Sequence, residues 1–177
     1  MKLVILAAAS VLALSGAAAN AQDTSNTQGV GHAYGSIGVT GTDNHKTDTN
    51  LNGVNVRLGT RLSPHFGVEG ETAFGTNHDT TADGQYKLTS KWGAYGVGYV
   101  PVSSSFDLIG RVGVSDTDLK TPAAAGKLEQ GTAFDYGVGA QYHINNDYAL
   151  RADVTRSEFN NNKGQSTTTS LNLVKKF

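Results

Sequence analysis

Residues 54–74 read VNVRLGTRLSPHFGVEGETAF, which predicts two strands joined by a turn at residues 63–65. Apolar and polar residues alternate along both limbs, and side chains on a strand point to opposite faces with a period of two. Each limb therefore has one apolar face and one polar face, and the polar face carries Arg57, Arg61, Glu69 and Glu71. In a soluble sheet this polar face would meet water, whereas in a membrane barrel it would line the lumen.

The N-terminus predicts a cleavable secretory signal peptide. Lys2 is followed by an apolar run over residues 3–14 and then by Ala19-Asn20-Ala21. A basic start, a short apolar core and an A-x-A site are the features of such a leader. The expected boundaries are a signal peptide at residues 1–21, an N-terminal periplasmic lead-in at residues 22–30 and a β-barrel domain at residues 31–177.

Composition narrows the class of protein further. The chain has 14 basic and 15 acidic residues, and removing the leader with Lys2 leaves a net charge of −2 without the clustered basic patch that nucleic-acid binding needs. No cysteine is present, so no disulfide holds the exported chain together. After the leader no apolar run approaches the roughly 20 residues of a membrane helix. The mean hydropathy of −0.30 resembles that of a soluble protein, but alternating barrel strands escape such averages.

The same alternation continues to the C-terminus and predicts eight strands. They are expected near residues 31–41, 54–62, 66–74, 86–100, 106–115, 132–144, 148–158 and 166–177. Long polar connections at residues 42–50, 75–85, 116–131 and 159–165 alternate with short ones. Outer-membrane barrels have short periplasmic turns and longer external loops. The pattern therefore predicts an all-β fold, an eight-stranded antiparallel up-and-down transmembrane β-barrel in the Gram-negative outer membrane.

Aromatic residues gather at the predicted strand ends, as they do in the girdles of membrane barrels. Those near the short turns are Phe66, Tyr99, Phe106, Tyr142, Tyr148 and Phe177, and those nearer the loops are Phe74, Trp92 and Phe134. In residues 86–100 the alternation places Tyr95, Val97 and Tyr99 on the outer face, which turns Trp92 inward. Trp92 would then lie above the membrane, or a bulge would shift the strand.

Charged residues of one parity form the predicted lumen charge network. They are Arg57, Arg61, Glu69, Glu71, Asp107, Arg111, Asp135, Arg151 and Asp153. Charges inside a narrow barrel must pair or be solvated, because isolated burial is costly. One interpretation is a plug of salt bridges that closes the lumen, and the other is a small gated pore whose pairs exchange partners. Eight strands enclose just enough room for side chains, which favours the plug.

No other constellation in the sequence predicts chemistry. The histidines are scattered without metal-ligand spacing: His32, His45, His65, His78 and His143. The pairs Gly96-x-Gly98 and Gly137-x-Gly139 open no helix and so are not a dinucleotide fingerprint. We therefore expect no metal, no cofactor and no catalytic residues, and a protein that is not an enzyme.

The sequence resembles the small outer-membrane β-barrels of the OmpA-like and OmpX-like type, often called porin-family proteins. The resemblance covers residues 31–177 and is carried by LGTRLSPHFGVE at 58–69, YGVGY at 95–99 and FxLxGRxG at 106–113. It implies that Leu171, Leu173 and Phe177 form the signal read by the barrel-assembly machinery, although Lys175 replaces a usual apolar residue. The peptidoglycan-binding domain of longer relatives is absent from the sequence.

Three functional hypotheses remain open at this point. The first is a structural or porin-like envelope protein surrounded by outer-membrane lipid and lipopolysaccharide. The second is an adhesin or serum-resistance protein of the OmpX type, which would bind host or surface ligands through its external loops. The third is a soluble lipocalin-like barrel, whose apolar face would instead surround a ligand.

Overall fold

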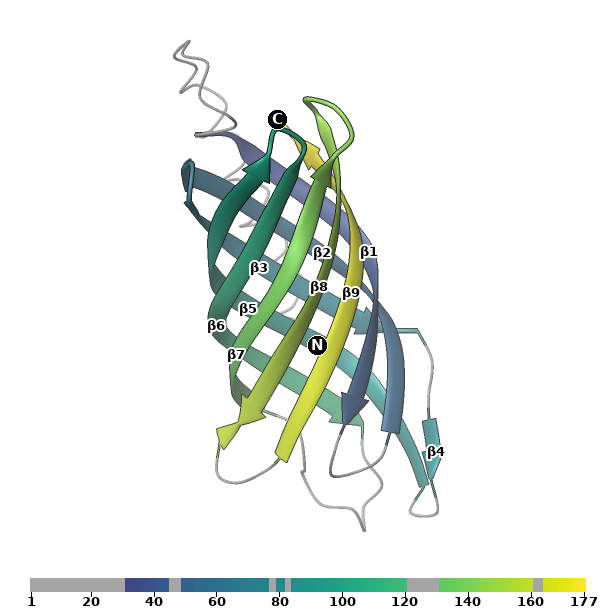
Figure 1. The fold of residues 1–177 in the computed structure, drawn as a ribbon. Helices are drawn as coiled ribbons and strands as arrows, with labels where there is room; N and C mark the ends of the chain where they lie inside the picture. The colour runs from purple at the N-terminus through teal and green to yellow at the C-terminus, as the bar shows by residue number, and fades with distance from the viewer. Residues whose placement is uncertain (1–30, 45–48, 77–78, 82–83, 121–130, 161–163) are drawn as a thin grey trace.

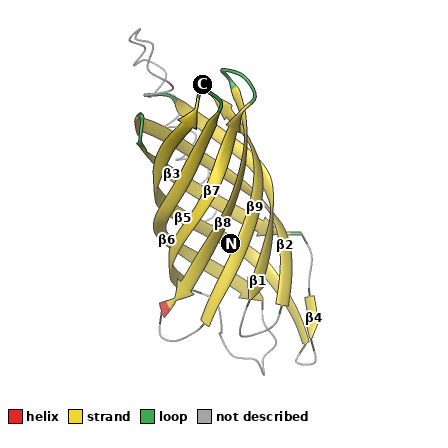
Figure 2. Cartoon of the chain, viewed as in Figure 1, coloured by secondary structure: helices red, strands yellow, loops and turns green. Residues whose placement is uncertain are grey.

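The computed structural model describes residues 31–44, 49–76, 79–81, 84–120, 131–160 and 164–177. These residues form a tilted cylinder of strands with almost no helix (Figures 1 and 2). The strands are β1 (Ala33–Asn44), β2 (Thr49–Ser63), β3 (Phe66–Gly75), β4 (Asp79–Thr81), β5 (Gly84–Ser103), β6 (Phe106–Lys120), β7 (Gly131–His143), β8 (Tyr148–Phe159) and β9 (Gly164–Lys176). In the described part of the chain, no helix has the length and apolar character needed to cross a membrane.

Eight of the nine strands close into a barrel. Each pairs antiparallel with its sequence neighbour, β3 pairs with β5, and β1 pairs with β9 from Tyr34–Lys176 to Asn44–Ser166. The short strand β4 pairs only with β5 and is not part of the ring. Because the first barrel strand meets the last, the ring has no open edge, as a sheet in lipid requires. The predicted eight-stranded up-and-down barrel is confirmed.

The apolar faces of the strands point outward and the polar faces point inward. Val56, Val68, Leu108 and Leu150 are 39–48% exposed, whereas Arg57 is 1% exposed. This is the arrangement of a barrel surrounded by lipid and the reverse of a lipocalin-like barrel. The lipocalin-like hypothesis is therefore wrong for this chain.

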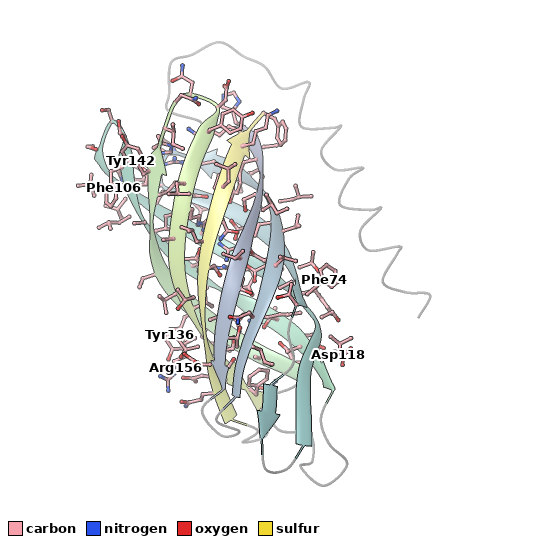
Figure 3. All side chains as sticks on the ribbon, turned by 90° about the vertical axis from the view of Figure 1, so that its right-hand side faces the viewer. Phe74, Phe106, Asp118, Tyr136, Tyr142 and Arg156 are labelled. Carbon is pink, nitrogen blue, oxygen red and sulfur yellow. The ribbon has the colours of Figure 1, made fainter. Side chains whose placement is uncertain are left out.

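Outward aromatic side chains form a belt near each end of the barrel. Phe66, Phe106, Tyr142, Tyr148 and Phe177 lie near the short turns, and Phe74, Trp92, Phe134 and Tyr136 lie toward the loops. Figure 3 shows this separation for Phe106 and Tyr142 against Phe74 and Tyr136. The belts are eight residues apart on β3 and on β7. That spacing is about 26 Å along the strand and roughly 20 Å through the membrane at the usual tilt.

The predicted orientation of the strand around Trp92 was wrong. In β5, Tyr95, Val97 and Tyr99 face the lumen, with Tyr99 only 3% exposed, and Trp92 faces outward at 64% exposure. The tyrosine rings pack against lumen arginines and their hydroxyls find polar partners, whereas the small side chains on the other face lie in contact with lipid. Tyr99 is therefore no member of the aromatic belt.

The strands also run further than the sequence predicted at the loop ends. β1 continues to Asn44, β5 begins at Gly84 and β6 ends at Lys120, so polar residues assigned to loops are paired. Pairing of β5 with β6 reaches Lys87–Lys120, beyond the last β3–β5 pair at Ala73–Lys91. With β4, this part of β5 projects from the end of the barrel opposite the C-terminus (Figure 1). The predicted leader and lead-in, residues 1–30, lie outside the described residues.

Candidate functional site: the charged lumen

Six charged side chains meet inside the barrel, and we call them the six-charge group. They are Arg57, Arg111, Arg151, Glu69, Glu71 and Asp153, and each side chain is at most 7% exposed. Three are cationic and three are anionic, so the group has no net charge. Inward parity on β2, β3, β6 and β8 brings these residues together from distant parts of the chain.

Short ion pairs connect the six-charge group. Arg57 donates from Nη1 and Nη2 to the two Asp153 oxygens at 2.7 and 3.0 Å, and its Nε lies 2.6 Å from Glu71 Oε2. Arg111 Nη1 reaches the same Glu71 oxygen at 2.9 Å. Arg151 Nη1 donates to Glu69 Oε2 at 2.7 Å. Since β3 and β8 are four strands apart in the ring of eight, this last pair spans the lumen.

A second charged cluster lies toward the short turns. Arg61 Nη1 donates to Asp107 Oδ2 at 3.1 Å, and Arg61 Nη2 also donates to the carbonyl of Pro64. His143 Nε2 lies 3.1 Å from the same Asp107 oxygen. The cluster therefore ties β2, β6 and β7 together at this end of the barrel.

A third cluster lies toward the loops and is centred on Asp135, which is fully buried. Lys91 Nζ is 3.0 Å from Asp135 Oδ2 and donates to Ser157 Oγ at 2.9 Å. Tyr95 donates from its hydroxyl to the same Asp135 oxygen at 2.7 Å. All nine predicted lumen residues thus lie inside the barrel, six in one group and three in these two flanking clusters.

Tyrosines complete the lumen and were missed by the sequence analysis. Tyr34 donates to Glu69 Oε2 at 2.9 Å and its hydroxyl lies 3.0 Å from that of Tyr99. The Tyr99 ring lies 4.2 Å from the Arg61 guanidinium carbon, and the Tyr95 ring lies 3.7 Å from that of Arg111. Such cation–π contacts stabilise guanidinium groups that are withdrawn from water.

Lys91 is a buried lumen cation that the sequence analysis did not include. It shares its face of β5 with Tyr95, so placing the tyrosine outward would have placed the lysine in lipid at the outer belt. A lysine on the lipid face costs free energy that depends on its depth. This cost was the signal that could have reversed the predicted orientation of β5.

The C-terminal residues lie on the outer surface. Leu171 and Leu173 face outward from β9, and the Phe177 amide donates to the Ala33 carbonyl at 2.9 Å. Lys175 lies 5.5 and 5.9 Å from the rings of Phe177 and Tyr148. The Lys175 ammonium therefore lies within cation–π range of two aromatic rings of the belt near the short turns. In the part of the chain that the structure describes, no group of His, Cys, Asp or Glu is placed to hold a metal ion.

Comparison with known proteins identifies the family. The family model described as "Outer membrane protein beta-barrel domain" matches residues 6–177, so the chain belongs to this family. The protein is an integral β-barrel of the Gram-negative outer membrane, surrounded by lipid and lipopolysaccharide. Comparison with curated protein sequences finds no match.

Solved structures share the fold at low sequence identity. OprG from Pseudomonas aeruginosa is 14% identical with a TM-score of 0.62, over 86% of this chain and 99% of that one. The N-terminal β-barrel domain of Pseudomonas aeruginosa OprF is 12% identical with a TM-score of 0.60, over 81% and 97%. Ail of Yersinia pestis, solved with the heparin analogue sucrose octasulfate, is 18% identical with a TM-score of 0.59, over 82% and 98%.

Proposed function

We propose that the protein is a structural, non-enzymatic barrel of the outer membrane whose lumen is closed to solutes by paired charges. The six-charge group is the observation that carries this proposal. It is electroneutral, buried and linked across the lumen by the Arg151–Glu69 pair. A buried charge that loses its partner costs several kcal/mol. Opening a path would separate several of these pairs at once, so the closed state is the stable one.

A small gated pore is the alternative that the same geometry supports. Glu69 and Asp153 each have all three arginines of the six-charge group within 4.0 Å. An arginine could therefore exchange one carboxylate for another without an unpaired intermediate. Partner exchange of this kind would open the lumen transiently.

Conductance across a planar lipid bilayer tests the closed lumen against the gated pore. The purified protein should give no steady conductance, and Arg111→Ala and Glu71→Ala should also be silent if the lumen is a plug. Steady channels in the unmodified protein, lost or widened by these substitutions, would contradict the plug and support gating. Arg156→Ala is the matched control, because Arg156 lies on the outer surface beside Glu158. A shift in gel mobility between unboiled and boiled samples verifies that each variant is folded.

Ligand binding at the external loops is a second candidate function, favoured by the projecting part of β5. Rigid scaffolds carry most binding function on their loops. A barrel of the same fold, Ail, was crystallised with a heparin analogue, so a sulfated polysaccharide is the first ligand to test. Deleting residues 118–129 should abolish binding to host cells or heparin, whereas deleting residues 161–163 should not. Unchanged binding after the first deletion would reject this function.

We also propose that residues 1–21 are removed on export and that Leu171, Leu173 and Phe177 direct barrel assembly. The A-x-A site supports the first proposal, and the outward position of the three C-terminal residues supports the second. N-terminal sequencing of protein from outer membranes should begin at Gln22. A sequence beginning at Met1 would show that the leader is retained.

A further inference from the structure

Lys175 is an exposed cation in the aromatic belt near the short turns, and no carboxylate of the described residues neutralises it. Its ammonium lies 5.9 Å from the centre of the Tyr148 ring and 5.5 Å from that of Phe177. None of the described residues forms an ion pair with it. By contrast, the outward Arg156 lies 4.0 Å from Glu158. Lys175 therefore presents an uncompensated positive charge on the surface that faces lipid.

The neighbouring strands fix the position of this ammonium. Lys175 pairs with Tyr148 on β8 and with Gly35 on β1. The Phe177 ring covers Gly35, because a Cβ on this glycine would lie 3.6 Å from Phe177 Cε2. The lysine thus lies between two rings, one on β8 and one over β1. Cation–π contacts with these rings favour the position but leave the net charge and the three N–H donors of the ammonium available.

Tyr148 places a second donor beside the ammonium. Its hydroxyl makes no hydrogen bond to any residue that the structure describes. Tyrosine at a membrane interface keeps its ring in the apolar layer and its hydroxyl among the lipid headgroups. An ammonium and a phenol hydroxyl next to one another match a phosphate group, whose oxygens accept hydrogen bonds from both.

We propose that Lys175 and Tyr148 bind the phosphate of an anionic phospholipid in the periplasmic leaflet of the membrane. The short turns of such barrels are periplasmic, so this belt lies at the headgroups of that leaflet. The charge of Lys175 favours an anionic headgroup over a zwitterionic one, in which a cationic group already neutralises the phosphate. One basic residue near an anionic membrane surface gives a preference of about fivefold. The site lies on the outer surface, so it does not depend on whether the lumen conducts.

Quenching of tryptophan by lipids brominated in their acyl chains measures which lipid lies beside a chosen position. The reporter is Leu173→Trp in a Trp92→Phe background, because Leu173 faces outward two residues from Lys175. Brominated phosphatidylglycerol and brominated phosphatidylcholine are each titrated into vesicles that hold the folded barrel. We expect phosphatidylglycerol to be preferred about fivefold beside position 173. The preference should disappear with Lys175→Gln and remain with Lys175→Arg, and a shift in gel mobility on boiling verifies that each variant is folded.

The natural chain offers a matched control, because Trp92 lies in the belt at the other end of the barrel. Lys175→Gln should leave the quenching of Trp92 by both lipids unchanged. Equal quenching by the two lipids beside position 173, or a preference that survives Lys175→Gln, would overturn the proposal. A change at Trp92 as large as that at position 173 would also overturn it, since the effect would then not be local.

Tyr148→Phe tests the second donor, because it keeps the ring and removes only the hydroxyl. This substitution should reduce the preference for phosphatidylglycerol beside position 173 by less than Lys175→Gln does. An unchanged preference would overturn the role of the Tyr148 hydroxyl.

Discussion

Arg57 illustrates how a single side chain is held inside this barrel. Its guanidinium group pairs with both Asp153 and Glu71, and it is almost completely buried. Buried pairs gain little over an apolar core but are costly to break, because the remaining partner stays charged and unpaired. The outward Arg156–Glu158 pair is half exposed at 4.0 Å and contributes much less.

Arg57→Ala should therefore lower the free energy of unfolding by about 3–5 kcal/mol. Arg156→Ala should change it by less than about 1 kcal/mol. The measurement is urea unfolding in lipid vesicles, followed by gel mobility. The double variant Arg57→Met/Asp153→Leu should lose less free energy of unfolding than Arg57→Ala. It removes both charges of the pair, so Asp153 is not left buried without Arg57. Equal effects of Arg57→Ala and Arg156→Ala would contradict the buried network.

Two glycines of β6, one facing inward and one facing outward, allow a matched pair of substitutions. A Cβ at Gly113 would lie 2.6 Å from Tyr95 Cδ1 and would clash with the Ala94 carbonyl, whereas a Cβ at outward Gly110 would meet nothing within 4 Å. Gly113→Ala should cost about 1–3 kcal/mol through overpacking. Gly110→Ala should be neutral or slightly stabilising, since alanine restricts the unfolded chain. The same urea unfolding measurement checks both, and a tolerated Gly113→Ala would mean that Tyr95 does not lie over Gly113.

For a whole strand, the sequence predicted the inward face of β6 correctly and that of β5 incorrectly. Phe106 and Leu108 alternate with Asp107 and Arg111, so the charges alone fix which face of β6 is inward. In β5, tyrosine or valine alternates with glycine. Hydrophobicity alone therefore predicted that the tyrosine face is the outer one, whereas it faces the lumen. Tyrosine suits a lumen as well as a lipid surface, because its ring can stack on arginine while its hydroxyl bonds a carboxylate.

Trp92 reports directly on the orientation of β5, because it is the only tryptophan in the chain. Its side chain faces lipid near the outer belt, so lipids brominated near the headgroup should quench its fluorescence more strongly than lipids brominated deep in the acyl chain. Fluorescence from the folded protein in vesicles measures this. Equal insensitivity to both lipids would place Trp92 in the lumen.

The last strand also carries a prediction about assembly. Deleting Phe177 should reduce the amount of folded barrel in the outer membrane. Phe177 directly follows β9, lies in the belt near the short turns, and donates its amide to the Ala33 carbonyl at the start of β1. The readout is the heat-modifiable band in purified outer membranes. Lys175→Phe restores an apolar residue at the position where the sequence differs from the family it resembles. This substitution should maintain or raise the amount of folded barrel. Normal assembly without Phe177 would reject its role as a signal.

Across the whole molecule, one rule of orientation explains the fold and the proposed function. Outward apolar residues between two aromatic belts match a membrane, and inward charges pair across a lumen too narrow for much else. The period-two pattern predicted the barrel, the strand number and the nine inward charges. It could not predict which pairs form, since partners such as Arg151 and Glu69 are 82 residues apart and meet only when the ring closes.

Accessibility of single spin labels tests this orientation most directly. Labels are attached to cysteines replacing Leu108 and Val112, which face outward, and Val97 and Ile109, which face inward. In lipid vesicles, oxygen should relax the labels at 108 and 112 strongly, while a water-soluble nickel chelate should not. Labels at 97 and 109 should respond weakly to both. The opposite result would be weak relaxation by oxygen at 108 and 112 together with strong relaxation by the nickel chelate at 97 and 109. It would contradict both claims, that the apolar residues face lipid and that the charged interior is closed.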